Sequence, residues 1–261
     1  MWHWIKQLDR LLRGETTNLI ELRRGTLDFP VLGICAITAL LGVVYGACMG
    51  LFAVTGSGNN AWMQIPSSMF KVPALFFLTL LVTTPSLYVF NALVGSRLTL
   101  GSVLRLLIAS LAIMLAVLAS LGPIVAFFAV SSTSYSFIML LNVAVYTLSG
   151  ALGLTFLLQT LHRISVAQQE TAPESSASDE SSEAPAGALD QLKGQVLGPH
   201  VRMIFRIWVI VFAVVGAQMA WVLRPFVGHP DKPFEWFRQR GGNFFETVWQ
   251  LIVGLFEWQS R

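Results

Sequence analysis

Residues 30–54 have the sequence PVLGICAITALLGVVYGACMGLFAV, an apolar run without a charged residue. About 20 residues of α-helix, each rising 1.5 Å, cross the ~30 Å hydrocarbon core of a bilayer. The run begins a much longer stretch, because no Asp or Glu occurs from Phe29 to Gln169. Carboxylates are the usual groups of proton relays and hydrolytic sites, so their absence bears on function as well as on location. This part of the sequence predicts a membrane protein.

The composition of the whole chain agrees with a membrane location. Hydrophobic residues make up 54% of the chain and charged residues 12%, whereas about 25% of residues are charged in a typical soluble domain. The formal net charge is only +3, and the longest run of basic residues is the pair Arg23 and Arg24. We therefore expect no nucleic-acid partner.

Five apolar segments reach or approach the length of a membrane span. They cover residues 30–54, 72–95, 103–130, 134–161 and 204–223. Only residues 131–133 separate the third segment from the fourth, which predicts a tight antiparallel hairpin.

Both termini are predicted to form helices that lie in the membrane interface. In residues 243–258, Asn243 and Glu246 form a helix start signal, and apolar residues follow at helical spacing. The short length and the glutamates of this segment favour a surface helix over a span. At the N-terminus, Trp2 and Trp4 begin a similar pattern. We expect an all-α fold, a polytopic transmembrane helix bundle of about five spans with interfacial helices at both termini.

The predicted spans divide the chain into five parts. They are an N-terminal cytoplasmic or interfacial helix (1–28), a four-span bundle (29–162), a cytoplasmic linker (163–202) that is acidic and disordered around 168–187, a fifth span (203–224), and an exterior tail with an amphipathic helix (225–261). The linker around 168–187 lacks large apolar residues, so it cannot form a core of its own.

The distribution of Lys and Arg predicts the orientation. With the N-terminus in the cytoplasm and the C-terminus outside, most of the basic residues lie on the cytoplasmic side, as is usual in membrane proteins. Lys71 stands just before the second segment and is expected to reach the lipid headgroups from the interface.

Small residues recur at helical spacing in three of the predicted spans, and such residues let helix backbones approach closely. The candidate packing residues are Gly42, Gly46, Gly50, Ala112, Ala116, Ser120, Ala213 and Ala217. They serve either packing within the chain or self-association between copies of it.

The second span is the most polar one. Pro85 predicts a kink, and the hydroxyl groups around it can satisfy the freed backbone carbonyls. The alternative interpretation is a polar seam between the second and fourth spans, which forms a hydrated path or a cleft for a small ligand. The candidate seam residues are Thr83, Thr84, Pro85, Ser86, Tyr88, Asn91, Asn142, Tyr146 and Ser149.

The sequence contains no pattern typical of catalysis or metal binding. Walker A, G-x-S-x-G, H-E-x-x-H and the usual metal-ligand spacings are absent, and no His lies inside a predicted span. We predict no catalytic residues, no metal site and no cofactor, and we expect that the protein is not an enzyme.

The five apolar segments, the cytoplasmic N-terminus and the acid-free core resemble the Yip1-like family of small five-span membrane proteins. The stretch KVPALFFLTLLVTTPSLYVFNALVGSRLTL (71–100) is similar to segments of uncharacterised bacterial relatives of that type. The resemblance covers residues 29–224. It implies a non-enzymatic role in membrane organisation, trafficking or assembly, and a location in the bacterial inner (cytoplasmic) membrane with the tail in the periplasm.

These observations lead to three functional hypotheses. The first is a non-enzymatic integral membrane protein for membrane organisation or for assembly of a membrane complex, with membrane lipids around it and further copies or other subunits as partners, most simply as a homo-oligomer. The second is a channel or transporter for a neutral or anionic solute through the seam of the kinked second span. The third is lipid binding between helices.

Overall fold

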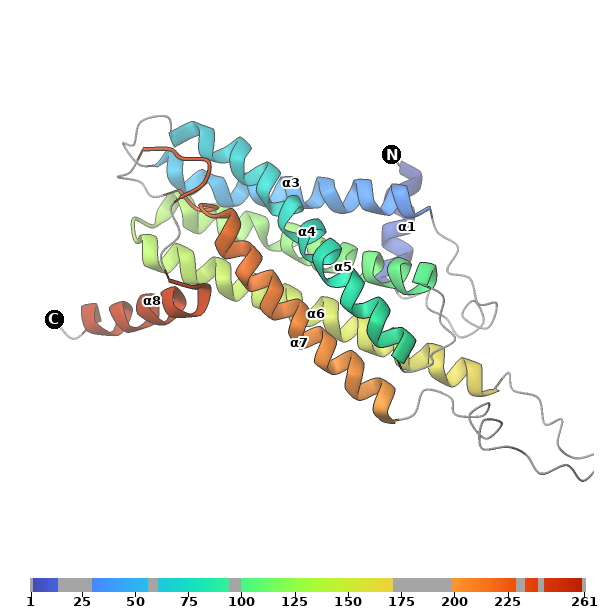
Figure 1. The fold of residues 1–261 in the computed structure, drawn as a ribbon. Coiled ribbons are helices and arrows are strands. Elements are labelled where there is room, and N and C mark those ends of the chain that lie inside the picture. The colour runs from blue at the N-terminus through green and yellow to red at the C-terminus, as the bar shows by residue number, and fades with distance from the viewer. Residues whose placement is uncertain are drawn as a thin grey trace, which may run out of the picture.

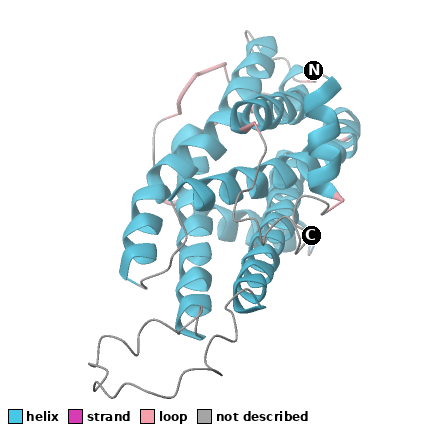
Figure 2. Cartoon of the chain, turned by 90° about the vertical axis from the view of Figure 1, so that its right-hand side faces the viewer, coloured by secondary structure: helices cyan, strands magenta, loops and turns pink. Residues whose placement is uncertain are grey.

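The computed structural model describes residues 2–13, 30–55, 61–93, 100–170, 199–228, 233–238 and 242–259. Every regular element in these ranges is a helix (Figures 1 and 2), which confirms the predicted all-α fold. The elements are α1 (Trp2–Leu12), α3 (Val31–Val54), the short 3₁₀ helix η2 (Ala61–Met63), α4 (Gln64–Leu93), α5 (Leu100–Ser131), α6 (Tyr135–Glu170), α7 (Pro199–Leu223) and α8 (Phe244–Gln259). The predicted acidic linker lies outside the described residues beyond Glu170.

Four helices are long and apolar enough to cross a membrane, which is the architecture of a polytopic membrane protein. These segments are Val31–Val54, Ala61–Ser86, Leu104–Ser131 and Tyr135–Thr160. The apolar parts of α7 and α8, Ile207–Leu223 and Phe244–Gly254, are shorter.

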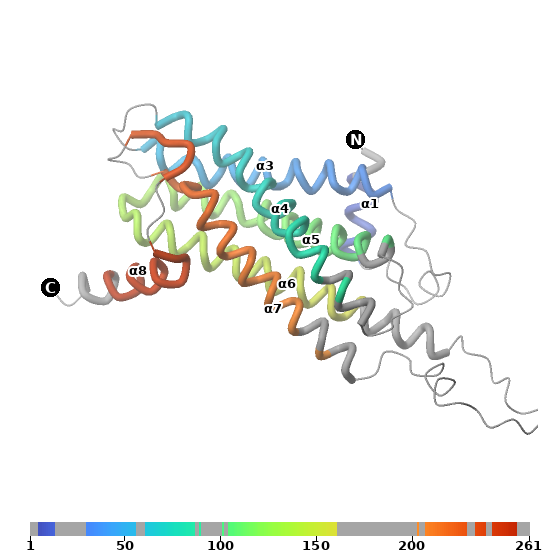
Figure 3. Tube along the Cα trace, in the orientation of Figure 1, coloured from blue at the N-terminus to red at the C-terminus, as the bar shows by residue number. Residues whose placement is uncertain are grey.

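The long helices lie side by side, and each carries the chain from one end of the bundle to the other (Figure 1). At one end α3 finishes, α4 begins, and a turn joins α5 to α6; we call this the hairpin end. The segment after α7 and the start of α8 also lie there (Figure 1). Helix α1 lies at the opposite end, the α1 end (Figure 3).

Two of the helices extend beyond the predicted spans, although the span-length apolar part of α6, Tyr135–Thr160, agrees with the predicted fourth span (134–161). Helix α4 begins at Gln64 instead of residue 72, and α6 continues to Glu170 instead of ending at residue 161. Lys71, which the sequence predicts to stand just before the second span, lies inside α4 and has a buried side chain. Helix α4 also continues through Pro73 and Pro85.

The predicted hairpin between the third and fourth spans is confirmed. Residues 132–134 join α5 to α6. The Ser134 hydroxyl accepts a hydrogen bond from the Phe137 N–H at 3.3 Å, and so caps the start of α6. Ser132 closes the end of α5, since its N–H donates to the Phe128 carbonyl at 2.9 Å.

Helices form at both termini, as predicted. In α1, Leu8 and Leu11 are buried against α3 and α5, whereas Ile5 and Leu12 are about half exposed. Helix α8 begins after Asn243, whose side-chain oxygen accepts a hydrogen bond from the Glu246 N–H at 2.9 Å. This contact is the side-chain cap that the sequence predicted.

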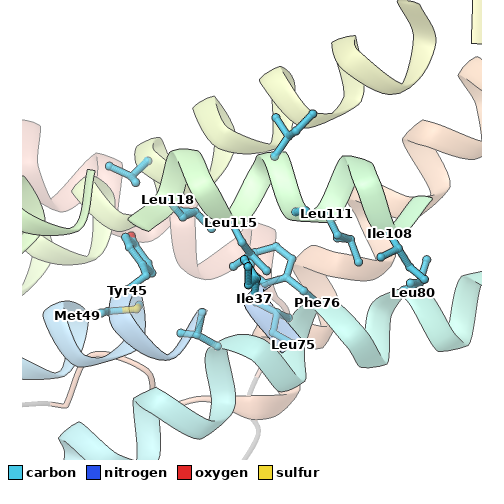
Figure 4. Packing of buried hydrophobic residues seen from close by; sticks show 14 of the residues in the cluster. Ile37, Tyr45, Met49, Leu75, Phe76, Leu80, Ile108, Leu111, Leu115 and Leu118 are labelled. Carbon is cyan, nitrogen blue, oxygen red and sulfur yellow. The ribbon is translucent and has the colours of Figure 1, made fainter. Parts of the chain in front are cut away.

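Helices α3, α4 and α5 form the centre of the core (Figure 4). The apolar side chains of all three converge there and are almost fully buried. The labelled members are Ile37, Tyr45, Met49, Leu75, Phe76, Leu80, Ile108, Leu111, Leu115 and Leu118.

The glycines of α3 allow its contact with α4. A Cβ atom at Gly46 would lie 2.8 Å from the Met69 Cα and closer still to the Ser68 carbonyl oxygen. At Gly50 it would lie 2.8 Å from the Ile65 Cα. Real Cβ atoms do not come this close to backbone, so the two helices can touch only where α3 has no side chain. Gly42, Gly46 and Gly50 therefore pack within the chain.

The contact predicts opposite effects for two Gly→Ala substitutions. Gly46→Ala forces α3 and α4 apart and should lower the free energy of unfolding by about 1–3 kcal/mol, the usual cost of overpacking. Gly101→Ala in α5 is the control, because nothing lies within 4 Å of a Cβ at that position. Since Ala favours helix over Gly by about 0.5–1 kcal/mol, the control should be neutral or stabilising.

Thermal unfolding of the purified protein in mild detergent, followed by circular dichroism, measures both variants. A midpoint for Gly46→Ala that matches that of Gly101→Ala would contradict the close contact.

Candidate functional site

Three polar side chains of α4 hold the segment that follows α7. Gln64, Ser68 and Lys71 share one face of the helix. The Gln64 amide donates to the carbonyl oxygens of Pro225 and Phe226 at 3.1 and 2.7 Å, and the Ser68 hydroxyl donates to the Phe226 oxygen at 2.5 Å. Backbone carbonyls outside regular structure are costly in an apolar setting unless they have a donor. The α4 side chains supply these donors.

Lys71 completes this contact, which we call the α4 clamp. Its ammonium donates to the carbonyl oxygens of Pro225, at 3.1 Å, and of Trp236. The rings of Trp236 and Phe237 lie beside it, with centroids 6.0 and 5.1 Å from Nζ. Lys71 is only 2% exposed. The prediction that it reaches the headgroups is therefore wrong, because carbonyls and rings of the same chain enclose its charge.

The clamped segment is part of the core of the hairpin end. Val227 is fully buried and Phe226 is 9% exposed. A Cβ atom at Gly228 would lie 2.7 Å from the Ala53 side chain of α3. The first residues of the predicted exterior tail (225–261) thus pack against α3 and α4.

A cavity of about 160 Å³ lies next to this segment, among α6, α7 and α8; we call it the end cavity. Its lining includes Tyr135, Asn142, Trp221, Arg224, Arg238 and Thr247. No described residue that lines it is acidic. The Arg224 guanidinium lies 3.7 Å above the Trp221 ring, so a cation–π contact orients it.

A larger cavity of about 430 Å³ separates α6 from α7; we call it the α6–α7 cleft. Gly150, Ala151 and Leu154 belong to its α6 wall, and Ala213, Gly216 and Ala217 to its α7 wall. The walls are almost entirely apolar. Small residues usually let two helices touch, but here α7 packs mainly against α4 and leaves a space beside α6.

The α6–α7 cleft adjoins the end cavity and opens to the surroundings of the bundle. Phe226, Phe244 and Tyr146 line both spaces. Thr147 and Ala213 line the cleft and are exposed, so the opening lies on the side of the bundle. From Val143 to Leu154, the α6 wall is about 16 Å long.

The hydroxyl groups of the predicted polar seam bond to their own helix. Thr83 donates to the Thr79 carbonyl at 2.8 Å, and Thr84 donates to the Leu80 carbonyl at 2.6 Å. Ser86 donates to the Thr83 carbonyl at 2.7 Å. Pro85 lies exposed inside α4. Tyr88 and Asn91 belong to α4, but their side chains lie outside the described part.

The seam residues of α6 face α3 and not the hydroxyls of α4. The Asn142 oxygen accepts a hydrogen bond from the Tyr45 hydroxyl at 3.0 Å, and the Tyr146 ring meets the Tyr45 ring edge-on at 5.5 Å. Tyr146 also stacks on Phe76 of α4, seven residues before Thr83. Seven residues of helix correspond to about 10 Å, so the two halves of the predicted seam lie at different depths.

Ser149 does not link the two halves either. Its hydroxyl is fully buried and has no hydrogen-bond partner among the described residues. The channel hypothesis stays a prediction, and the described contacts do not join the seam residues into one path.

The remaining small residues have separate places. Ala112 is fully buried in α5, Ala116 is partly buried, and Ser120 is exposed with its hydroxyl bonded to the Val117 carbonyl at 2.7 Å. Ala213 and Ala217 line the α6–α7 cleft.

The described residues contain no group of three His, Cys, Asp or Glu side chains that could hold a metal ion. Comparison with protein-family models, with curated proteins and with solved structures gave no match. The resemblance to the Yip1-like family therefore stays a prediction.

Sequence reasoning missed the α4 clamp and the two cavities. Gln64, Ser68 and Lys71 precede residue 72, where the second span was predicted to begin, and the carbonyls they bind lie more than 150 positions away in the sequence. The small residues that line the α6–α7 cleft predict close contact between helices, which is the opposite of the space found there.

The α4 clamp predicts that Lys71→Met loosens the segment after α7. The Trp236 carbonyl loses its described donor. A hydrogen bond from a charged group is worth about 1.5 kcal/mol, which is roughly a tenfold change in the population of the open segment. Tryptic cleavage after Arg238 should therefore be about tenfold faster, since cleavage follows that population.

Lys6→Met on the exposed face of α1 is the control and should leave the cleavage rate unchanged. Equal cleavage rates in Lys71→Met and the native protein would contradict a clamping role for Lys71.

Proposed function

We propose that this protein is a non-catalytic integral membrane protein that binds one acyl chain of a membrane lipid in the α6–α7 cleft, and that it serves membrane organisation in this way. The observation that carries the proposal is the apolar cleft of about 430 Å³ that opens on the side of the bundle. Ligand sites commonly have volumes of about 300–1,000 Å³ and mostly apolar walls.

The length and position of the cleft suit an acyl chain. Its α6 wall is about 16 Å long, close to the ~15 Å that one leaflet contributes to the hydrocarbon core. The exposed residues Thr147 and Ala213 stand at the opening. A lipid chain could therefore enter from the bilayer without passing through water.

Exposed tryptophans support a membrane interface at the hairpin end. Trp62, Trp236 and Trp249 are 62%, 50% and 67% exposed and come from η2, the segment after α7 and α8. Tryptophan is enriched where hydrocarbon meets headgroups. In the proposed orientation the hairpin end faces the exterior, and the lipid comes from the leaflet on that side.

The α6–α7 cleft is the only part of this proposal that the small residues of α7 support, since Ala213, Gly216 and Ala217 line it. The glycines of α3 are already in contact with α4, so the homo-oligomer predicted from the sequence would need a different surface.

Photocrosslinking with a lipid that carries a diazirine on its acyl chain tests the proposal. In reconstituted protein we expect crosslinks to concentrate in residues 143–154 and 213–220. Ala217→Phe fills the cleft and should strongly reduce this labelling, because the aromatic ring takes the space of the chain.

Val214→Phe is the matched control. Val214 neighbours the cleft residues on α7, but it is 44% exposed and does not line the cleft. Its substitution should leave the labelling of residues 143–154 intact. Labelling spread evenly over exposed positions such as Phe127 and Ile210, with no effect of Ala217→Phe, would rule out an acyl-chain site in the cleft.

A further inference from the structure

Two arginines meet at the mouth of the end cavity. The Arg238 N–H donates to the Arg224 carbonyl at 3.3 Å, so a backbone hydrogen bond joins the two ends of the segment after α7. The α4 clamp holds the same segment at Pro225 and Trp236. Both arginine side chains line the end cavity. These contacts fix the backbones of Arg224 and Arg238 close to each other.

We propose that Arg224 and Arg238 bind the phosphate of a lipid headgroup, and that these two cations favour anionic lipids because the ammonium group of a zwitterionic headgroup would lie close to them. The inference rests on the proposed binding of an acyl chain in the α6–α7 cleft. It adds the class of headgroup and the residues that recognise it. Arginine suits this role, because its guanidinium can donate two hydrogen bonds to one phosphate.

The two cavities follow each other as the acyl chain and the headgroup do in a lipid. The α6–α7 cleft is apolar, and the end cavity continues it toward the hairpin end, with Tyr146 and Phe226 shared by both. Arg224 directly follows Leu223, the last residue of α7. An acyl chain in the cleft would therefore leave its headgroup at the level where the fifth predicted span ends.

The surroundings of the arginines favour an anion. The described lining of the end cavity contains these two cations and no carboxylate. Basic pockets between transmembrane helices bind anionic headgroups in other membrane proteins, there on the cytoplasmic or matrix side. Thr247 at the start of α8 and Tyr135 at the start of α6 add hydroxyl groups to the lining.

The apolar connection favours a lipid over a free anion. A site for inorganic phosphate alone would not need the α6–α7 cleft beside it, and burying a small ion among Met49, Val248 and Leu251 would cost solvation free energy. For a lipid, the favourable free energy of burying its acyl chain offsets this cost.

Competition between two lipids with identical acyl chains tests the inference. Full-length protein is photolabelled with diazirine-bearing phosphatidylglycerol or phosphatidylcholine over a range of lipid concentrations. We expect phosphatidylglycerol to reach half-saturation at about a tenfold lower concentration than phosphatidylcholine, since both carry the same phosphate but only phosphatidylcholine brings an ammonium group close to the two guanidinium cations. Arg238→Gln should remove most of this preference and keep the labelling by phosphatidylcholine, which shows that the variant is folded.

Arg10→Gln on the exposed face of α1 is the charge-matched control and should keep the preference. Equal labelling of the cleft by both lipids in the native protein would overturn the headgroup inference and leave acyl-chain binding in place. Absence of cleft labelling by either lipid would overturn the proposed function itself. A preference for phosphatidylglycerol that persists in Arg238→Gln would also overturn the inference, because the headgroup would then be recognised by other residues.

Discussion

The close approach of α3 and α4 is the contact on which the rest of the structure depends. Gly46 lets the backbone of Ser68 and Met69 lie directly on α3. This position of α4 turns the face of Gln64, Ser68 and Lys71 toward the segment after α7. A side chain at Gly46 would displace that face. The core of α3, α4 and α5 and the arrangement of the hairpin end thus depend on this one contact between the backbones of α3 and α4.

The buried Lys71 holds the non-helical backbone of the segment after α7 in place. Irregular backbone at membrane depth is tolerated only where protein or a water-filled cavity surrounds it and supplies partners. Lys71 donates to the carbonyl oxygens of Pro225 and Trp236, near the two ends of the segment after α7. Through Phe226 the same segment shapes the wall of both cavities. Packing at one end of the bundle therefore determines the place where a lipid could bind.

Local patterns predicted the elements, but not how they meet. The apolar runs located the long helices, the serines after α5 predicted the hairpin, and Asn243 predicted the start of α8. Lys71 was misplaced because its partners, Pro225 and Trp236, are distant in the sequence. The small residues of α3 and α7 have similar spacing, yet those of α3 contact α4 and those of α7 line the cleft. This difference arises because α7 packs against α4, and the sequence of one helix alone does not reveal which helix it packs against.

A density map of the full-length protein in a lipid nanodisc, with a bound antibody fragment to aid alignment, tests the central claim most directly. The account predicts α3 and α4 in contact at Gly46, α7 apart from α6, and elongated density in the α6–α7 cleft that ends near Arg224 and Arg238. A map in which α6 and α7 touch along Gly150 and Ala217, with no space for a chain between them, would contradict it.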